Sequence, residues 1–234
     1  MKRMKLIDDL ISSVEDKPVD DLRIGIRYTG VRIGESIGLA YSFPNRRLTP
    51  GDEPEVDLIG KKVLNLIKSE NLTKASTGNG ALNALLPLNK YKKMNVFDHI
   101  LKMAKNYENI GIVGRFPFVA KLKNKNYKMF EMDPRGEELP ASAEEELLPE
   151  CDLVIITGTA LTNHTLERLL EISNGFKMVI GPTTPLSPIL FDYGADLLAG
   201  VRVKDRKVLE IVSQGGGTRK FKPYVEDVVI ESKR

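Results

Sequence analysis

Hydrophobic and polar residues alternate between residues 23 and 43, and short glycine-containing stretches interrupt the alternation. Arg23–Tyr28 follows a strand-like period, Thr29-Gly30 is a turn signal, and Val31–Ile33 resumes the pattern. Gly34-Glu35-Ser36 is a further turn signal before Ile37–Phe43. We expect a helix before these strands and helices after them. The pattern therefore predicts a small α+β domain built on a three-stranded antiparallel meander.

The residues after the meander predict a polar loop, two helices and a domain boundary. Pro44–Pro54 is the expected loop, and Asp52 with Glu55 matches a capping box. A shorter helix is expected around Ala81–Leu86. Pro87–Met94 separates two apolar units, which places one domain at residues 1–94 and the other at 95–234. The apolar face of the first helix is expected on Val56, Ile59, Val63, Leu66 and Ile67.

The second domain is predicted to be a Rossmann-like parallel sheet with helices on both faces. Asn95 is the expected N-cap of a helix that leads to Asn109. Short apolar strands then alternate with helical segments, which favours parallel strands joined by right-handed crossovers. The strands are expected at Ile110–Val113, Tyr127–Met132, Leu153–Ile156, Lys177–Ile180 and Leu197–Val203, with Asp227–Glu231 as an additional strand.

Composition narrows the class of protein without indicating an activity. The 234 residues are 41% hydrophobic and 29% charged, and 35 Lys+Arg stand against 32 Asp+Glu, as in a soluble globular protein without strong charge bias. No segment approaches the roughly 20 apolar residues of a membrane helix, so we expect no membrane partner. The first ten residues contain two aspartates where a signal peptide would be apolar. With the single cysteine, Cys151, this predicts a cytoplasmic protein.

Ligands of open parallel sheets bind beyond the carboxyl ends of the strands, so each strand end is a candidate site. Gly114, Arg115 and Phe116 follow the first strand, but the third glycine of a dinucleotide fingerprint is missing, which disfavours NAD-type binding. Asp133 follows the second strand, where dinucleotide folds place an acid on a ribose hydroxyl. Asp133-Pro134 suits a plain chain turn equally well.

Hydroxyl groups cluster after the third strand. The helix that follows carries Leu166 and its apolar neighbours on one face, and Thr162 or Asn163 could cap it. Capping explains one of these residues but not the whole cluster, whose hydroxyl and N–H groups suit an anion or a polar head group. His164 would add a proton donor or acceptor near neutral pH, although a catalytic role is the weaker hypothesis. The ligand-binding residues expected here are Thr157, Gly158, Thr159, Asn163, His164 and Thr165.

The fourth strand ends in Gly181-Pro182-Thr183-Thr184-Pro185-Leu186-Ser187-Pro188. Glycine permits a sharp exit, the prolines stiffen the turn, and Ser187-Pro188 is expected to cap a short helix at Ile189–Tyr193. Thr183 and Thr184 have no such structural role, and a stiff loop loses little entropy when it binds a ligand. We therefore expect Gly181, Thr183 and Thr184 to contact the ligand.

Several of these segments resemble one known family. The "putative heavy-metal chelation" domain family is similar at Gly114–Val119, Leu148–Thr159, Asn163–Leu166, Gly181–Pro188, Gly194–Asp196 and Ala199–Val201. Ile37–Tyr41 and Ala81–Leu86 resemble the small domain usually fused to it, which is similar to the N-terminal domain of enolases. The resemblance implies these two domains with a cleft between them. It implies no reaction, and at His164 the relatives are expected to have a small residue such as glycine.

The leading hypothesis is therefore a small-molecule site in that cleft, at the strand ends. Asn83 would reach in from the first domain, because an amide on an otherwise apolar helix needs a partner. Arg46 and Arg47 are weaker candidates, since loop arginines are mostly solvated. A planar, nitrogen-rich ligand or a phosphorylated one would suit Phe116 and Phe118 beside hydroxyl groups, although both are also ordinary core residues. Whether the site catalyses a reaction, which cofactor it uses and whether the chain forms a homo-oligomer stay open.

Two further hypotheses concern other kinds of partner. A protein that handles a metal or a metal chelate is the alternative, but soft metals prefer thiolate and imidazole, and the chain has one Cys and two His without ligand spacing. We therefore assign no metal ligand, although Glu131 and Asp133 could hold a hard cation. Nucleic acid is disfavoured by the weak overall charge. Its candidate residues are Arg115, Lys121, Lys123, Lys125 and Lys128, interleaved with Phe116, Phe118 and Tyr127.

Overall fold

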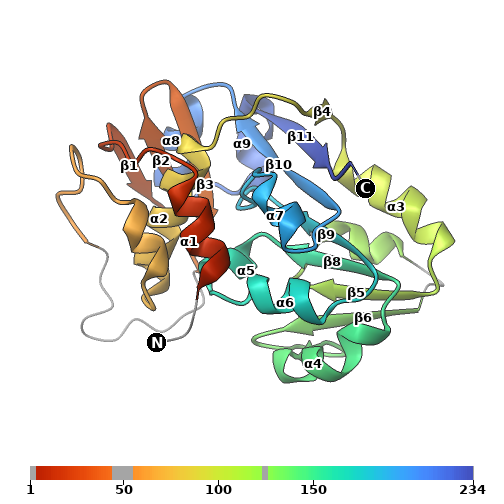
Figure 1. Cartoon of the computed structure of the whole chain (residues 1–234). Helices are drawn as coiled ribbons and strands as arrows, with labels where there is room; N and C mark the ends of the chain where they lie inside the picture. The colour runs from red at the N-terminus through yellow and green to blue at the C-terminus, as the bar shows by residue number, and fades with distance from the viewer. Residues whose placement is uncertain (1–3, 44–54, 123–125, 234) are drawn as a thin grey trace.

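The computed structural model describes residues 4–43, 55–122 and 126–233 and has two sheets (Figure 1). The small sheet has the order β1-β2-β3, and the large sheet has the order β4-β11-β10-β9-β8-β5-β6-β7. Together with their helices they form a two-domain α/β fold, as the sequence predicts. The boundary between residues 94 and 95 stays a prediction. Arg46, Arg47, Asp52, Lys123 and Lys125 lie outside the described residues.

The small sheet is the expected antiparallel meander, made of β1 (Asp21–Ile24), β2 (Tyr28–Ile33) and β3 (Ser36–Tyr41). The expectation for its first turn was wrong, because the chain turns between β1 and β2 and Thr29-Gly30 lies inside β2. Gly30 packs against α8: a Cβ there would lie 2.7 Å from Leu209 Cδ2. Glycine inside a strand is typical of such a close approach between two elements, so Gly30 has a packing role there and not a turn role.

The helices around the small sheet differ from the prediction. The expected helix on Val56–Ile67 is wrong: Val56 and Ile59 are 75% and 56% exposed, and only the 3₁₀ turn η1 (Leu64–Lys68) forms. Positive φ angles at Asp57 and Gly60 are incompatible with a helix there. Instead α2 (Leu72–Leu85) is longer than predicted and begins at Asn71, whose side chain caps it. The buried positions of α2 are mostly small or polar, so its sequence lacks a helical apolar stripe.

The large sheet contains six parallel strands and two antiparallel ones. Strands β10, β9, β8, β5, β6 and β7 run parallel in that order, while β11 is antiparallel to β10 and β4 is antiparallel to β11. The predicted strands are confirmed with small shifts at their ends. The bounds are β4 (Lys92–Lys93), β5 (Asn109–Val113), β6 (Asn126–Glu131), β7 (Leu139–Pro140), β8 (Leu153–Thr157), β9 (Phe176–Ile180), β10 (Leu197–Val203) and β11 (Val225–Glu231).

Helices cover both faces of the large sheet, because successive strand residues point to opposite faces. Ile155 packs into the apolar cluster on the α3 side, and Ile156 into the cluster with α5, α6 and α7. Asn95 caps α3 as predicted. The helices are α3 (Val96–Met103), α4 (Glu144–Leu147), α5 (Thr159–Thr162), α6 (Leu166–Ile172), α7 (Ile189–Asp192), α8 (Lys207–Ser213) and α9 (Thr218–Phe221), with 3₁₀ turns η2 (Ala104–Asn106), η3 (Pro117–Lys121), η4 (Ala141–Ala143), η5 (Leu148–Glu150) and η6 (Lys222–Tyr224).

The first helix, α1 (Lys5–Ser12), joins the two layers. Figure 1 shows it between α2 and the helices of the large sheet. Its Leu6, Ile7 and Leu10 are buried in the same apolar cluster as Ile156 of β8 and Leu82 of α2. The core is therefore continuous across the two sheets, which fixes their relative position through burial of apolar surface. In the described part of the chain, no helix has the length and apolar character needed to cross a bilayer.

Candidate functional site at the ends of the parallel strands

The strand order reverses between β5 and β8. From β5 the chain builds outward through β6 and β7, whereas β8, β9 and β10 are added on the other side of β5. At such a switch point the two loops that leave neighbouring strands diverge, and ligands of open α/β sheets bind there. The loop that begins at Gly114 and the loop that begins at Gly158 therefore flank the place that the topology favours for a ligand.

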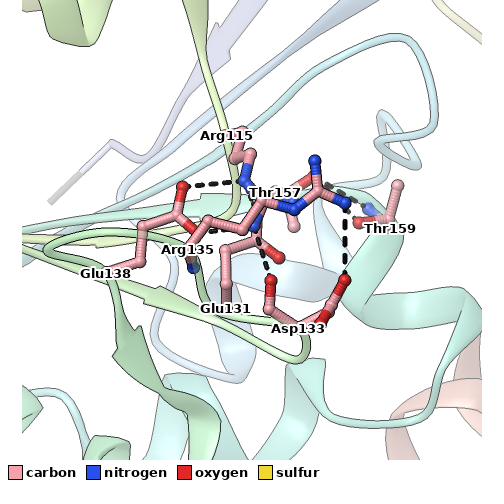
Figure 2. A network of polar contacts seen from close by, with 7 residues as sticks. All are labelled: Arg115, Glu131, Asp133, Arg135, Glu138, Thr157 and Thr159. Atoms are coloured by element: carbon pink, nitrogen blue, oxygen red, sulfur yellow. Dashed lines mark hydrogen bonds and ion pairs between the residues drawn. The ribbon is translucent and has the colours of Figure 1, made fainter.

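Arg115, directly after β5, is held in place by its neighbours (Figure 2). Its Nε and Nη2 donate to the two carboxylate oxygens of Glu138, at 2.7 and 2.5 Å, and Nη2 also donates to the main-chain oxygen of Asp133 at 2.6 Å. Such a two-point pair fixes the guanidinium plane. Gly114 has a φ of +103°, and a Cβ there would lie 2.9 Å from Thr157 Cβ, so the turn requires glycine.

Asp133 contacts Arg115 through its main chain, and its carboxylate acts on the guanidinium only through its charge. The carboxylate of Asp133 is 79% exposed and pairs with Arg135 at 3.4 Å. Sequence reasoning selected Asp133 for a carboxylate that faces the ligand, whereas here it positions Arg115 with a carbonyl oxygen.

The acidic side chains of this region have pKa values that are shifted in different directions. Glu131 lies 3.9 Å from Arg115 Nε, and burial raises its pKa although the guanidinium opposes the shift. Burial, together with the charge of Glu131, raises the pKa of Glu144 in α4 to about 7. The hydrogen bonds from Arg115 lower the pKa of Glu138 instead. Near neutral pH the cluster therefore contains one firmly ionised carboxylate and one that exchanges a proton readily.

Glu138 and Glu144 were not predicted from the sequence as site residues, and Glu131 was predicted only as a ligand of a hard cation. Glu138 and Glu144 belong to an acidic stretch that resembles a solvated surface segment. The contact of Glu138 with Arg115 and the influence of Glu131 on Glu144 both join residues that are distant in the sequence. A sequence signal for this group of acidic residues was Glu131, a charged residue at the end of an apolar strand.

The threonines after β8 complete this side of the cluster (Figure 2). Thr157 and Thr159 are half-buried, and their hydroxyl oxygens lie 2.9 Å apart in a hydrogen bond. Gly158 between them lies against the loop after β9, since a Cβ there would be 2.5 Å from Thr184 N. The two hydroxyl groups thus have fixed positions at the switch point, and each retains capacity for another hydrogen bond.

Tyr41, the last residue of β3, faces the cluster from the small sheet. Burial raises the pKa of its hydroxyl, Arg27 opposes the shift, and the charge of nearby Glu131 adds to it. The sequence analysis did not select this residue, because an alternating strand does not show which of its aromatic residues lies beside another domain.

The loop after β9 uses its polar groups to dock on the small sheet. Thr183 Oγ1 accepts a hydrogen bond from Tyr41 N at 3.0 Å, and Asn83 Nδ2 donates to the carbonyl oxygens of Thr183 and Leu39 at 3.1 and 2.9 Å. Thr183 and Thr184 are buried. Gly181 has a φ of +117°, as its role in a sharp exit requires. Among the described residues, Asn83 Oδ1 and Thr184 Oγ1 have no hydrogen-bond partner.

The residues between α5 and α6 have separate local roles. Asn163 Oδ1 accepts from the N–H and hydroxyl of Thr165, and His164 lies next to Ile67 of η1 with Nε2 2.8 Å from its main-chain oxygen. The expected cap of α6 was wrong: the helix starts at Leu166 after Thr165 without a side-chain cap, while buried Thr162 accepts from Asn79. At α7, Pro188 holds the cap position and Ser187 Oγ accepts from Ile189 N at 3.4 Å.

The aromatic and basic residues proposed for nucleic acid are partly engaged elsewhere. Phe118 is only 2% exposed and Phe116 stacks on it with centroids 5.4 Å apart, so Phe118 belongs to the core. Lys128 pairs with Glu150 at 3.3 Å and Arg115 with Glu138. The described residues therefore do not form an open basic surface with interleaved aromatic rings, which single-strand binding requires.

The potential ligands for a soft metal are dispersed. Cys151 is 3% exposed, its thiol donates to Leu147 O, and burial raises its pKa, which favours the thiol over the thiolate that binds metals. His99 lies in α3 and His164 beside η1. Among the described residues, no three His, Cys, Asp or Glu side chains form a group that could hold a metal ion. The donor set therefore does not fit a protein-only soft-metal centre.

Comparison with known proteins agrees with the fold and with the family suggested by the sequence. Family models described as "Putative heavy-metal chelation" match residues 95–231 and residues 7–86. The chain therefore belongs to this family. An uncharacterised protein of Methanocaldococcus jannaschii is 25% identical over 209 residues, which cover 82% of this chain and 81% of that protein.

Two crystal structures from the same family, both of proteins with unknown function, have a similar fold. The protein from Desulfitobacterium hafniense DCB-2 superposes with a TM-score of 0.82 at 29% identity and covers 97% of each chain. The protein from Pyrococcus horikoshii has a TM-score of 0.79 at 23% identity and covers 97% of this chain and 98% of its own. At the latter identity the likeness shows the fold alone.

Proposed function

We propose that this protein binds a small polar molecule at the switch point between β5 and β8, on the side that faces Tyr41. The observation that carries this proposal is the cluster in Figure 2: an arginine fixed by Glu138, a half-buried Glu131 and the paired hydroxyls of Thr157 and Thr159. Fixed polar groups at strand ends lose little entropy when a ligand binds. The cleft inferred from the sequence stays a prediction.

The chemistry of the cluster favours a ligand with an anionic or phosphorylated group. Arg115 uses Nε and Nη2 for Glu138 and Asp133, and within the described part of the chain its Nη1 makes no hydrogen bond. Arg115 Nη1 and the two threonine hydroxyls could all donate to phosphate oxygens. A planar ligand is the other form of the proposal, and it would rest on the half-buried rings of Tyr41 and Phe116 rather than on Phe118.

The test is ligand binding by the full chain and by matched variants. ADP, a pterin and a metal chelate such as ferric citrate are screened by thermal shift and native mass spectrometry. We expect one of these probes to bind. Thr157→Val and Arg115→Gln should each lower the affinity for that probe about tenfold or more, because each variant removes a hydrogen-bond donor to a charged group. Thr183→Ser, which keeps the docking hydroxyl, serves as the control. The proposal would be refuted if no probe bound, or if Thr157→Val and Arg115→Gln both bound the ligand as tightly as the unaltered chain.

Handling of a metal or metal chelate is the second candidate, and the family description favours it. Because the described cysteine and histidines are dispersed, a soft metal would have to arrive with its own chelating ligand. Elemental analysis of protein purified without chelators separates the two candidates. A stoichiometric metal supports the second, and its absence together with binding of ADP supports the first.

Other aspects of function stay predictions. The readily titrated Glu144 beside Glu131 is suited to proton exchange. Cytoplasmic location is likewise a prediction, and light scattering of the purified chain determines whether it forms a homo-oligomer.

A further inference from the structure

A cavity of about 190 Å³ lies between α1 and the turn that joins α5 to α6. Its apolar walls are Met4, Leu6 and Ile7 at α1 together with Leu161 and Leu166 of α5 and α6. None of these residues belongs to the cluster around Arg115. An apolar cavity of ~150 Å³ in another protein is known to accept benzene, so this volume has room for one ring with a short substituent.

The rim of the cavity includes His164, whose backbone has an unusual conformation. Its φ is +64°, in the left-handed region that favours glycine, and a non-glycine residue there costs on the order of 1 kcal/mol. The ring is oriented by the contact between Nε2 and the main-chain oxygen of Ile67, at 2.8 Å. Because a carbonyl oxygen only accepts, Nε2 carries a proton, and in the matching neutral tautomer Nδ1 is an acceptor.

Two glutamates add negative charge to the same rim. Glu167 is half-buried, and its Oε2 accepts from Leu6 N at 3.0 Å, which leaves Oε1 as an acceptor. Glu171 pairs with Arg168 at 2.7 Å, and the remaining arms of Arg168 bind Glu145 at 2.8 and 2.6 Å. Three of the five N–H groups of Arg168 are thus used by Glu145 and Glu171. The lining thus contains two carboxylates, of Glu167 and Glu171, and one guanidinium, of Arg168, which gives it one net negative charge.

We propose that this cavity is a binding site for a compact apolar amine, with its ring or branched chain between the leucine walls and its ammonium group at Glu167 and His164 Nδ1. The walls select an apolar body by excluding water from it. The rim offers acceptors and net negative charge, so it selects a cationic head over a carboxylate. The site is distinct from the strand-end site, and the proposal does not depend on the function proposed there.

The test compares three probes that share a ring and differ in the head group: benzylamine, benzyl alcohol and phenylacetate. Binding to the full chain is followed by two-dimensional NMR of Ile, Leu and Met methyl groups. We expect benzylamine to shift the Leu161 and Leu166 signals, and phenylacetate to bind at least about tenfold more weakly, which corresponds to about 1.4 kcal/mol. Equal affinity for benzylamine and phenylacetate, or no shift with benzylamine, would overturn the proposal.

Two variants test the rim without filling the cavity. Glu167→Gln keeps an oxygen that can accept from Leu6 N but removes the charge. It should lower the affinity for benzylamine about fivefold to tenfold and change the affinity for benzyl alcohol little. His164→Asn is compatible with the left-handed backbone and removes the imidazole acceptor; it should also weaken benzylamine. Glu146→Gln, on an exposed residue of α4, is the control and should leave benzylamine binding unchanged. Unchanged benzylamine affinity in both rim variants would contradict the assigned position of the ammonium group.

Discussion

The loops after β8 and β9 are similar in sequence and different in use. Each leaves a buried parallel strand with a glycine and two threonines, Thr157 and Thr159 in one and Thr183 and Thr184 in the other. Thr183 accepts from Tyr41 N and joins the large sheet to the small one, whereas Thr157 and Thr159 bond to each other beside Arg115. The same residue types therefore serve docking in one loop and a candidate binding site in the other, and their neighbours decide which.

The largest expected effect concerns the contact between the two loops. In Gly158→Ala the new Cβ would lie 2.5 Å from Thr184 N, and because main chain cannot yield as a flexible side chain can, we expect a loss of about 3 kcal/mol in unfolding free energy. Urea unfolding measures it. Gly181→Ala is the control: its φ of +117° also strains a Cβ, but no atom lies within 4 Å of it, so it should cost less. Equal losses in both variants would show that crowding between the loops is unimportant.

Removal of the docking hydroxyl should have the next largest effect. Thr183→Val leaves Tyr41 N without its partner at a buried contact, which should lower the unfolding free energy by about 2 kcal/mol. Thr183→Ser retains the hydroxyl and should recover most of that loss. If Val and Ser at this position are equally stable, the hydrogen bond to Tyr41 does not hold the two sheets together.

A smaller effect is expected from Glu144 and depends on pH. Its pKa is about 7 in the folded protein against 4.5 for an ordinary glutamate, so between these values the folded state binds more protons than the unfolded state. Stability contributed by protonated Glu144 is complete below pH 4.5 and lost as pH rises through 7. Glu144→Gln should therefore gain stability relative to wild type over this range, on the order of 1 kcal/mol after allowance for solvent.

Thermal unfolding from pH 4 to 8 measures this difference, and Glu145→Gln, which also removes a charge that raises the pKa of Glu144, is the comparison variant. The pKa of Glu145 is lowered by its hydrogen bond from Arg168, so its contribution has the opposite sign and is lost as pH falls. A stability difference between Glu144→Gln and wild type that does not change with pH would show that Glu144 is not a strained acid of the candidate site.

The smallest effect on stability is expected at the switch point itself. Thr157→Val removes one hydrogen bond between two half-buried hydroxyls that water can replace, so the unfolding free energy should fall by less than about 0.5 kcal/mol. Urea unfolding beside Thr183→Val makes the comparison direct. If Thr157→Val proves as costly as Thr183→Val, the loop after β8 is a structural contact like the loop after β9.

The parts of the fold that were predictable have strong local patterns. The meander, the parallel strands and the cap at Asn95 follow from alternation, short apolar runs and capping chemistry. Helix α2 was underestimated because Gly78 packs against the Ile67 main chain and buried Asn79 bonds to Thr162. Close approach and buried hydrogen bonds replace the apolar stripe there, and neither has a helical period in the sequence.

The candidate site was only partly predictable for a related reason. Gly114, Arg115, Thr157 and Thr159 were selected because parallel strands end at one edge of a sheet. Glu138 and Glu144 were not selected, because the contact of Glu138 with Arg115 and the influence of Glu131 on Glu144 arise only in the folded chain. Thr183 and Asn83 were selected as ligand-binding residues, and their contacts with Tyr41 and Leu39 give them a docking role in addition to that prediction.

The sequence by itself determined the class of fold, the positions of most strands and the family, because local periodicity and residue order are properties of the chain. Tertiary structure alone decided which threonine hydroxyls face Tyr41 N, which acids surround Arg115, and that the pKa of Glu144 rises to about 7. Those properties arise from burial and from charges that folding brings together although their residues are distant in the chain. Hydrogen bonds and pKa values depend on distance in space and not on separation in sequence.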